Sequence, residues 1–230
     1  MDARHRFDAK LLETLFVDDH HARGAVADLA GKFKDEIVPL QITRADGSTD
    51  THNIDEGIRF DVSLDGIKSV KLIAENGKHT AASASQICDG ASGVLIVNEK
   101  GLKSLGVKPM ARIHHMTMIG GDPVIMLEAP LPATERALKK AGMSIDDIDL
   151  FEVNEAFAAV PVAWLQTTGA DPARLNVNGG AIALGHPLGG SGTKLMTTLV
   201  NALKQNNKRY GLQTMCEGGG MANVTIVERL

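Results

Sequence analysis

The sequence predicts an α/β protein built from layers of helices and strands. Its second half alternates short apolar runs, typical of buried strands, with longer stretches whose apolar residues recur at helical spacing. Aromatic residues make up only 3% of the 230 residues while glycine occurs 24 times, which favours close packing and tight turns. Hydrophobic residues at 43% and charged residues at 23% form an ordinary globular balance, so the chain can bury a substantial core.

The second half gives the clearest elements. A helix is bounded by Pro132 at its start and Gly142 just past its end. In order, we expect a strand over 111–118, a helix over 132–141, a strand over 149–153, helices over 155–168 and 191–204, and strands over 210–215 and 223–227.

The first half is less regular. A helical pattern over residues 1–34 is interrupted at Asp18-Asp19-His20-His21, and residues 36–43 resemble a strand that leads into a turn at Asp46-Gly47. Apolar runs predict two further strands, over 70–73 and 93–97. The run of small residues between them, 80–86, suits a surface that another group approaches closely.

Composition excludes several classes of function. A net charge of -4 argues against a nucleic-acid binder that acts through bulk electrostatics. Only two cysteines are present, Cys88 and Cys216, which indicates a reducing compartment and a cytoplasmic location. We expect no membrane span and no signal peptide, since no apolar run approaches about 18 residues. We also expect no metal, since His20-His21 has no further ligands at metal spacing.

Three short segments carry candidate chemistry. Asn154, in Asn-Glu-Ala-Phe157, is either a helix N-cap or a functional amide. His186 lies between Gly185 and Pro187 in a glycine-rich turn ahead of a helix, where backbone can pass close to a ligand. Cys216 precedes Gly218-Gly-Gly220. It is either a small buried residue in a hairpin or a reactive thiol beside amides that face a developing oxyanion.

Taken together, the segments Asn-Glu-Ala-Phe, Gly-His-Pro-Leu-Gly-x-Ser-Gly and Cys-x-Gly-Gly-Gly resemble the C-terminal half of thiolases, in that family's order and spacing. The resemblance runs from about Lys32 to the C-terminus, and the first 30 or so residues match poorly. It implies a layered αβαβα fold, truncated to the C-terminal half plus part of the N-terminal and loop regions. Residues 1–107 would be a partial loop domain with the last strands of the N-terminal domain, and 108–230 the C-terminal domain.

The resemblance also implies roles for individual residues. Cys216 would move a proton at the α-carbon of the acyl group, which suits a thiol whose ordinary pKa lies near neutral pH. His186 would activate a nucleophilic cysteine and bind the thioester oxygen, Asn154 would hold a water at one oxyanion site, and the Gly218 amide would serve the other. The positions that would line the acyl-CoA channel are Ser85, Met126, Ala156 and Phe157.

The nucleophilic cysteine of the family has no match in this sequence. Cys88 lies where the family does not place it, and we interpret Cys88 as a small buried residue. The resemblance implies acyl-CoA as substrate, no permanently bound cofactor, and either a homo-oligomer or a companion chain that supplies the N-terminal half. Leu127-Glu-Ala129 replaces a small glycine-rich turn common in acetyl-specific members, which implies a long, branched or polycyclic acyl group. The run 216–223 resembles thiolases of fatty-acid or steroid side-chain breakdown. The alternative is an inactive thiolase-fold module that binds acyl-CoA or a partner.

Overall fold

The structure is a computed structural model that describes the backbone of residues 9–230 and side chains from Thr14 onward. Its centre is a four-stranded mixed sheet in the order β3-β6-β5-β4. The strands are β3 (Ala111–Gly120), β4 (Leu150–Val153), β5 (Tyr210–Glu217) and β6 (Met221–Arg229). Strand β6 runs antiparallel to both β3 and β5, whereas β4 and β5 are parallel.

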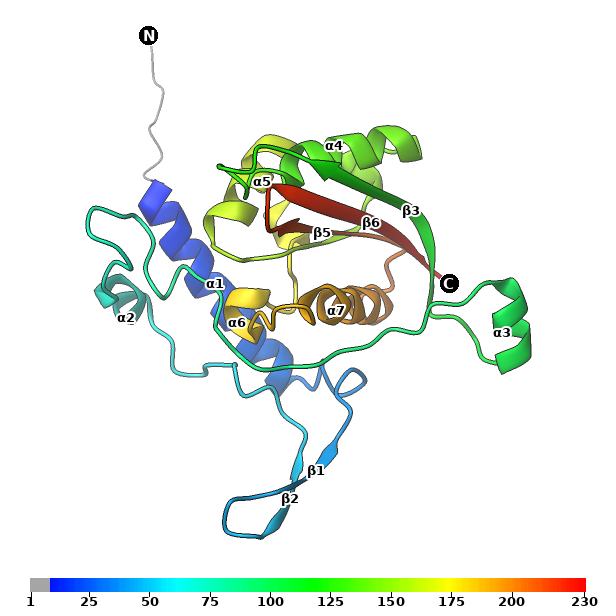
Figure 1. Ribbon diagram of the computed structural model, residues 1–230, viewed down its shortest axis with the longest axis horizontal. Helices are drawn as coiled ribbons and strands as arrows, with labels where there is room; N and C mark the ends of the chain where they lie inside the picture. The colour runs from blue at the N-terminus through cyan, green and yellow to red at the C-terminus, as the bar shows by residue number, and fades with distance from the viewer. Residues whose placement is uncertain (1–8) are drawn as a thin grey trace.

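Helices cover both faces of this sheet (Figure 1). Helices α4 (Pro130–Ala141) and α5 (Ala159–Thr168) lie on one face. There Trp164 is fully buried, its ring centroid lies 5.1 Å from that of Phe151, and its Nε1 donates to Thr134 Oγ1 at 2.8 Å. This indole therefore fills the main core and still satisfies its one polar group.

Helix α7 (Ser191–Gln205) covers the opposite face. Its Leu199 and Leu203 press on Gly211 of β5, where a Cβ would lie 2.9–3.0 Å from their side-chain carbons. A glycine within the strand therefore lets the helix approach the sheet closely. Because residues alternate along β5, Leu212, Thr214 and Cys216 point to the other face, which α4 and α5 cover.

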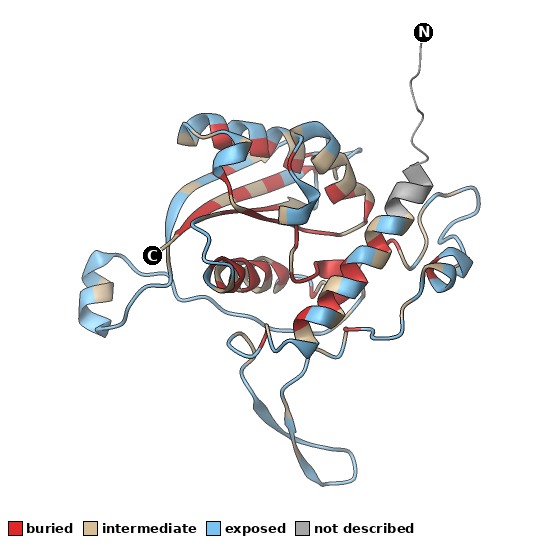
Figure 2. Ribbon diagram, turned by 180° about the vertical axis from the view of Figure 1, so that it is seen from behind, coloured by how far each residue is buried: buried red, intermediate tan, exposed pale blue. Residues whose placement is uncertain are grey.

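Helix α1 (Ala9–Leu29) packs against α6 (Ala181–Leu184). The predicted interruption at Asp18–His21 is wrong: the helix is continuous from Ala9, and His20 and His21 are buried within the stripe that α1 turns inward (Figure 2). These histidines interrupt the apolar pattern of the sequence, but the helix continues through them. Both side chains are buried, so they belong to the inward face of α1 although they are polar. Residues 1–8 of the predicted helix lie outside the described residues.

The rest of the first half contains few strands. A hairpin of β1 (Leu40–Thr43) and β2 (Thr49–His52) confirms the turn at Asp46-Gly47, where Gly47 has a φ of +83°. Short helices α2 (Leu64–Ser69) and α3 (Glu99–Leu105) follow. The strands predicted over 70–73 and 93–97 do not form, because a strand needs a neighbour and these segments have at most an isolated bridge at Leu72.

The predicted elements of the second half are confirmed, with one informative shift in a boundary. Helix α5 begins at Ala159 and not at 155, and the residue that caps it is Ala158. Asn154 is therefore not an N-cap. Two short 3₁₀ turns, Ile145–Asp147 and Pro172–Arg174, complete the fold. Among the described residues, no helix is long and apolar enough to cross a membrane.

Candidate active site

His186 lies in the turn between α6 and α7, where its ring is fixed from one side. Its Nδ1 is 2.5 Å from Ser191 Oγ, and the Ser191 hydroxyl donates to the carbonyl of Pro187 at 2.8 Å. Since the serine proton is used on Pro187, the serine oxygen accepts from Nδ1–H, which leaves Nε2 unprotonated and able to accept a hydrogen bond. Burial also lowers the pKa of His186, which favours this neutral form.

Asn154 follows β4 directly and faces that nitrogen. Its backbone N–H donates to the carbonyl of Thr214 at 2.9 Å, and its Nδ2 lies 3.4 Å from His186 Nε2. Within the described residues its Oδ1 is buried without a hydrogen-bond partner. A buried amide oxygen in that state can accept a hydrogen bond from a water or a ligand.

A pocket of about 390 Å³ opens beside His186. It is lined by the segments 85–90 and 186–188. Ser85 lies at its edge, where its N–H and hydroxyl both donate to the carbonyl of Ala156, at 3.1 and 3.3 Å. Phe157 pairs with Ala84 across the same contact, and its ring lies 5.0 Å from that of His79. Four predicted positions, Ser85, Asn154, Ala156 and Phe157, thus lie in two adjoining segments next to His186.

Cys88 also lines this pocket. It is half-buried, and its sulfur covers Gly185 so closely that a Cβ there would lie 2.6 Å away. The interpretation of Cys88 as a small buried residue is therefore wrong: the thiol lies in the same hollow as His186. Nothing in its sequence context signals this, because the proximity arises only when two segments almost 100 residues apart meet.

Cys216 lies near the end of β5, two residues beyond the Thr214 carbonyl that holds Asn154. The thiol is half-buried, and burial raises its pKa, so the protonated form predominates at neutral pH. In residues 14–230 no hydrogen bond joins its sulfur to Asn154 or His186. The structure thus brings the imidazole and the carboxamide into contact and places the thiol on β5, the strand next to β4.

The three glycines after Glu217 form the turn between β5 and β6. Gly219 and Gly220 have φ values of +82° and +80°, and a Cβ on Gly220 would lie 2.6 Å from the Asp122 carbonyl oxygen. Backbone geometry therefore requires glycine at both positions. Gly218 has open space where its Cβ would be, so steric need does not explain that residue. Met126 lies in the adjoining loop, with a φ of +59°.

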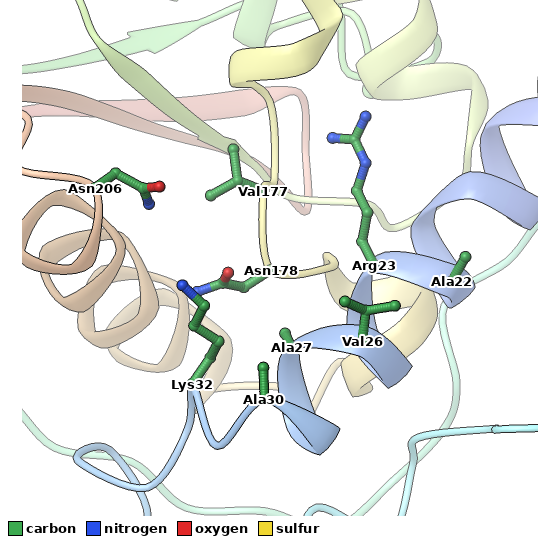
Figure 3. A pocket seen from close by; sticks show the side chains of 9 residues that line it. All are labelled: Ala22, Arg23, Val26, Ala27, Ala30, Lys32, Val177, Asn178 and Asn206. Atoms are coloured by element: carbon green, nitrogen blue, oxygen red, sulfur yellow. The ribbon is translucent and has the colours of Figure 1, made fainter.

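A second pocket, of about 330 Å³, lies between α1 and the segment that contains Val177 and Asn178 (Figure 3). None of the predicted site residues lines it. The structure also places at the site Ser191, which the sequence did not single out, and Cys88, to which the sequence assigned no role in the site. A serine in the first turn of the helix after a Gly-His-Pro turn is the one signal that points to Ser191.

Comparison with known proteins identifies the family of this chain. The C-terminal domain of the thiolases matches residues 107–229, and their N-terminal domain matches residues 14–100. The second match corrects the expectation that the resemblance begins near Lys32. The steroid 3-ketoacyl-CoA thiolase FadA6 of Mycobacterium tuberculosis (strain ATCC 25618 / H37Rv) is 52% identical over 210 residues, which cover 91% of this chain and 50% of that protein.

Solved structures give the same result. Human mitochondrial 3-ketoacyl-CoA thiolase superposes with a TM-score of 0.88 at 35% identity, over 99% of this chain and 57% of that one. The human enzyme in complex with CoA gives a TM-score of 0.86 at 35% identity, over 99% and 56%. The chain spans about half the length of the relatives it matches. Its layered α/β architecture is the thiolase fold, and the chain belongs to the thiolase family.

Proposed function

We propose that this chain carries the acid–base part of a thiolase site, which cleaves or forms the carbon–carbon bond of a 3-ketoacyl-CoA. The observation that carries the proposal is the contact between Asn154 and His186, which leaves the Asn154 amide oxygen buried beside the imidazole without a partner among residues 14–230. Because that oxygen is an acceptor, it would act on a developing oxyanion through a bound water, whose O–H donates to the thioester oxygen.

The proposed chemistry is proton transfer at the α-carbon. Cys216, as thiolate, takes a proton from the α-carbon of the acyl group and returns it, while negative charge moves to the thioester oxygen. A water held by Asn154 Oδ1 donates to that oxygen, and the Gly218 amide serves the second oxyanion site. The raised pKa of Cys216 makes its thiolate scarce but more basic, which suits a group that both removes and returns a proton.

Acyl transfer needs a second, nucleophilic cysteine. We infer that Cys88 does not serve, since its sulfur is pressed against Gly185 and makes no hydrogen bond to His186 in the described part of the chain. The nucleophile would then come from sequence outside these 230 residues. His186 would activate it through Nε2, the nitrogen that the contact with Ser191 leaves unprotonated.

The substrate is inferred to be a 3-ketoacyl-CoA with a long, branched or polycyclic acyl group, without a permanent cofactor. The likeness to a thiolase named for steroid substrates and to one solved with CoA supports this class. Ser85, Met126, Ala156 and Phe157 would line the channel for its pantetheine arm and acyl group. Both cysteines are free thiols, which fits a reducing compartment such as the cytoplasm.

The chain is also proposed to bind a companion, either a second copy or a chain with the N-terminal half. Residues 88–97 run without a strand partner, and Leu95 and Ile96 are 76% and 69% exposed. Met116 and Met118 of the edge strand β3 are exposed as well. Unpaired edges and apolar patches of this kind mark surfaces that another chain covers.

Deuterium uptake from D₂O into the methyl group of acetyl-CoA tests the proposal with the purified chain. We expect slow uptake that the Cys216→Ala variant loses, because proton exchange at that carbon needs the thiol and no acylation step. Cys88→Ala is the matched thiol variant: loss of uptake in Cys88→Ala but not in Cys216→Ala would transfer the role to Cys88. Binding of acetyl-CoA without any uptake would instead favour a binding module, and acyl transfer by the isolated chain would refute the missing nucleophile.

A further inference from the structure

The carboxylate of Glu155 joins the two loops that carry Asn154 and His186. One oxygen, Oε1, accepts from Asn176 Nδ2 at 2.5 Å, and the other, Oε2, accepts from the backbone N–H of Ile182 at 2.9 Å. Ile182 belongs to α6, which ends one residue before the Gly185-His186 turn. A Cβ on Gly180 would overlap this carboxylate at 2.2–2.4 Å, so the loop is shaped around it.

The third partner of Glu155 comes from α1, far away in the sequence. Nδ1 of His20 lies 2.5 Å from Glu155 Oε1, and the two side chains are 2% and 0% exposed. The ring of Phe16 stacks on that of His20 with centroids 3.8 Å apart, which fixes the imidazole from the side. A buried carboxylate needs such a partner, since an uncompensated charge in the interior is strongly destabilising.

His20 also decides which buried carboxylate is charged. Burial opposes ionisation of Glu155, but the contacts with His20, Ile182 and Asn176 outweigh it and lower its pKa. Glu152 is equally buried, and burial together with the nearby charge of Glu155 raises its pKa well above the ordinary value. Of these two acids, Glu155 therefore carries the negative charge, and its carboxylate is the one that bonds to Asn176 and to Ile182.

Helix α1 is anchored firmly enough to support this contact. The guanidinium of Arg23 donates to the carbonyl of Leu175 at 2.6 Å, next to Asn176, and Figure 3 shows this side chain reaching from α1 toward that segment. At Gly24 the helix touches α6, where a Cβ would lie 2.8 Å from that of Ala183. The position of His20 is thus fixed by these contacts one turn further along α1 and by the Phe16 ring one turn before it.

We propose that His20 is a positioning residue of the site: from α1 it holds the Glu155 carboxylate in the place that keeps Asn154 and His186 in contact. The inference rests on the proposed function, because it assigns His20 to the same pair of groups. His20 acts through Glu155, since its Nδ1 lies in ion-pair distance of that carboxylate, whereas the contacts of His186 are with Asn154 and Ser191.

The test compares His20→Leu with His21→Leu in the full chain. His21 is the matched control: it is the next residue of the same helix and is also buried, but it makes no ion pair with Glu155 in the described structure. Two NMR readouts need no turnover, the titration midpoint of His186 and the hydrogen exchange of the Ile182 amide. In His20→Leu we expect the His186 midpoint to rise toward 6.5, as the loop admits water, and the Ile182 amide to exchange about tenfold faster. His21→Leu leaves both nearer to the wild type.

Two further variants keep the test decisive. His20→Gln retains an N–H donor for Glu155 and restores both readouts. If His20→Leu does not fold, the double variant His20→Leu/Glu155→Gln removes the unpaired charge, and its Ile182 amide exchanges faster than in Glu155→Gln alone. Equal changes in His20→Leu and His21→Leu, or no change in a folded His20→Leu, would overturn the proposal. Absence of deuterium uptake in the wild type would refute the proposed function while these two readouts still decide the role of His20.

Discussion

Residues 108–230 and residues 30–107 are organised in opposite ways. In the former, strands β4, β5 and β6 each have a partner, and helices bury Leu212 and Ile226 completely. In the latter, the segment 93–97 is an apolar run, yet it has no strand partner within the described residues and exposes Leu95 and Ile96. The difference teaches that an apolar run becomes a strand only where a neighbouring strand forms hydrogen bonds with its backbone N–H and C=O groups.

The largest expected effect on the free energy of unfolding comes from a substitution in the core of residues 108–230. Trp164→Ala removes a fully buried indole between α5 and the sheet, together with the hydrogen bond that it donates to Thr134 Oγ1. We expect a loss of about 3–5 kcal/mol in the free energy of unfolding, from lost burial and the cavity left behind. Urea denaturation measures it. A loss below about 1 kcal/mol would mean that the helix layer is not tightly packed.

The pH dependence of the free energy of unfolding tests a contact between the two regions. Glu36 precedes β1 and accepts from Thr198 of α7 at 2.8 Å, and burial raises its pKa to about 7 from 4.5. The folded state therefore binds more protons than the unfolded state between these pH values, so stability falls as pH rises from 4.5 to 7 and then levels off. The loss is on the order of 1–3 kcal/mol.

Glu36→Gln keeps the acceptor for Thr198 but cannot ionise. We expect this variant to show a flatter profile of unfolding free energy between pH 4.5 and 7, and to exceed the wild type at pH 8. Thermal unfolding at a series of pH values measures the difference. Parallel profiles for the two proteins would show that Glu36 titrates normally in the folded state.

The smallest effect is expected in the unpaired segment. Leu95→Ala changes an exposed side chain and should alter stability by less than about 0.5 kcal/mol. The backbone amides of 93–97 should also exchange with solvent far faster than those of β5 and β6, because they have no strand partner. Slow exchange there in a purified sample would indicate that a second copy already covers the segment.

The sequence predicted the second half well because its patterns are local. Alternating apolar residues, Pro at a helix start and Gly142 at a helix end act within a few positions, and each expected element formed. The predictions failed where the outcome depends on distant contacts. The pairing of His20 with Glu155, the placement of Cys88 beside His186 and the missing partner of residues 93–97 are all set by segments far apart in the chain.

The packing of α1 against α6 decides where the chain can be cut into fragments. By sequence α1 falls mostly within the match to the N-terminal domain, residues 14–100, but its Gly24 touches Gly179 and Ala183 of the C-terminal match. A fragment cut at residue 107 would keep every strand of the large sheet and still leave the Glu155 carboxylate without its imidazole. The point where the two family matches meet is therefore not a point at which the chain can be cut without losing a contact next to the proposed site.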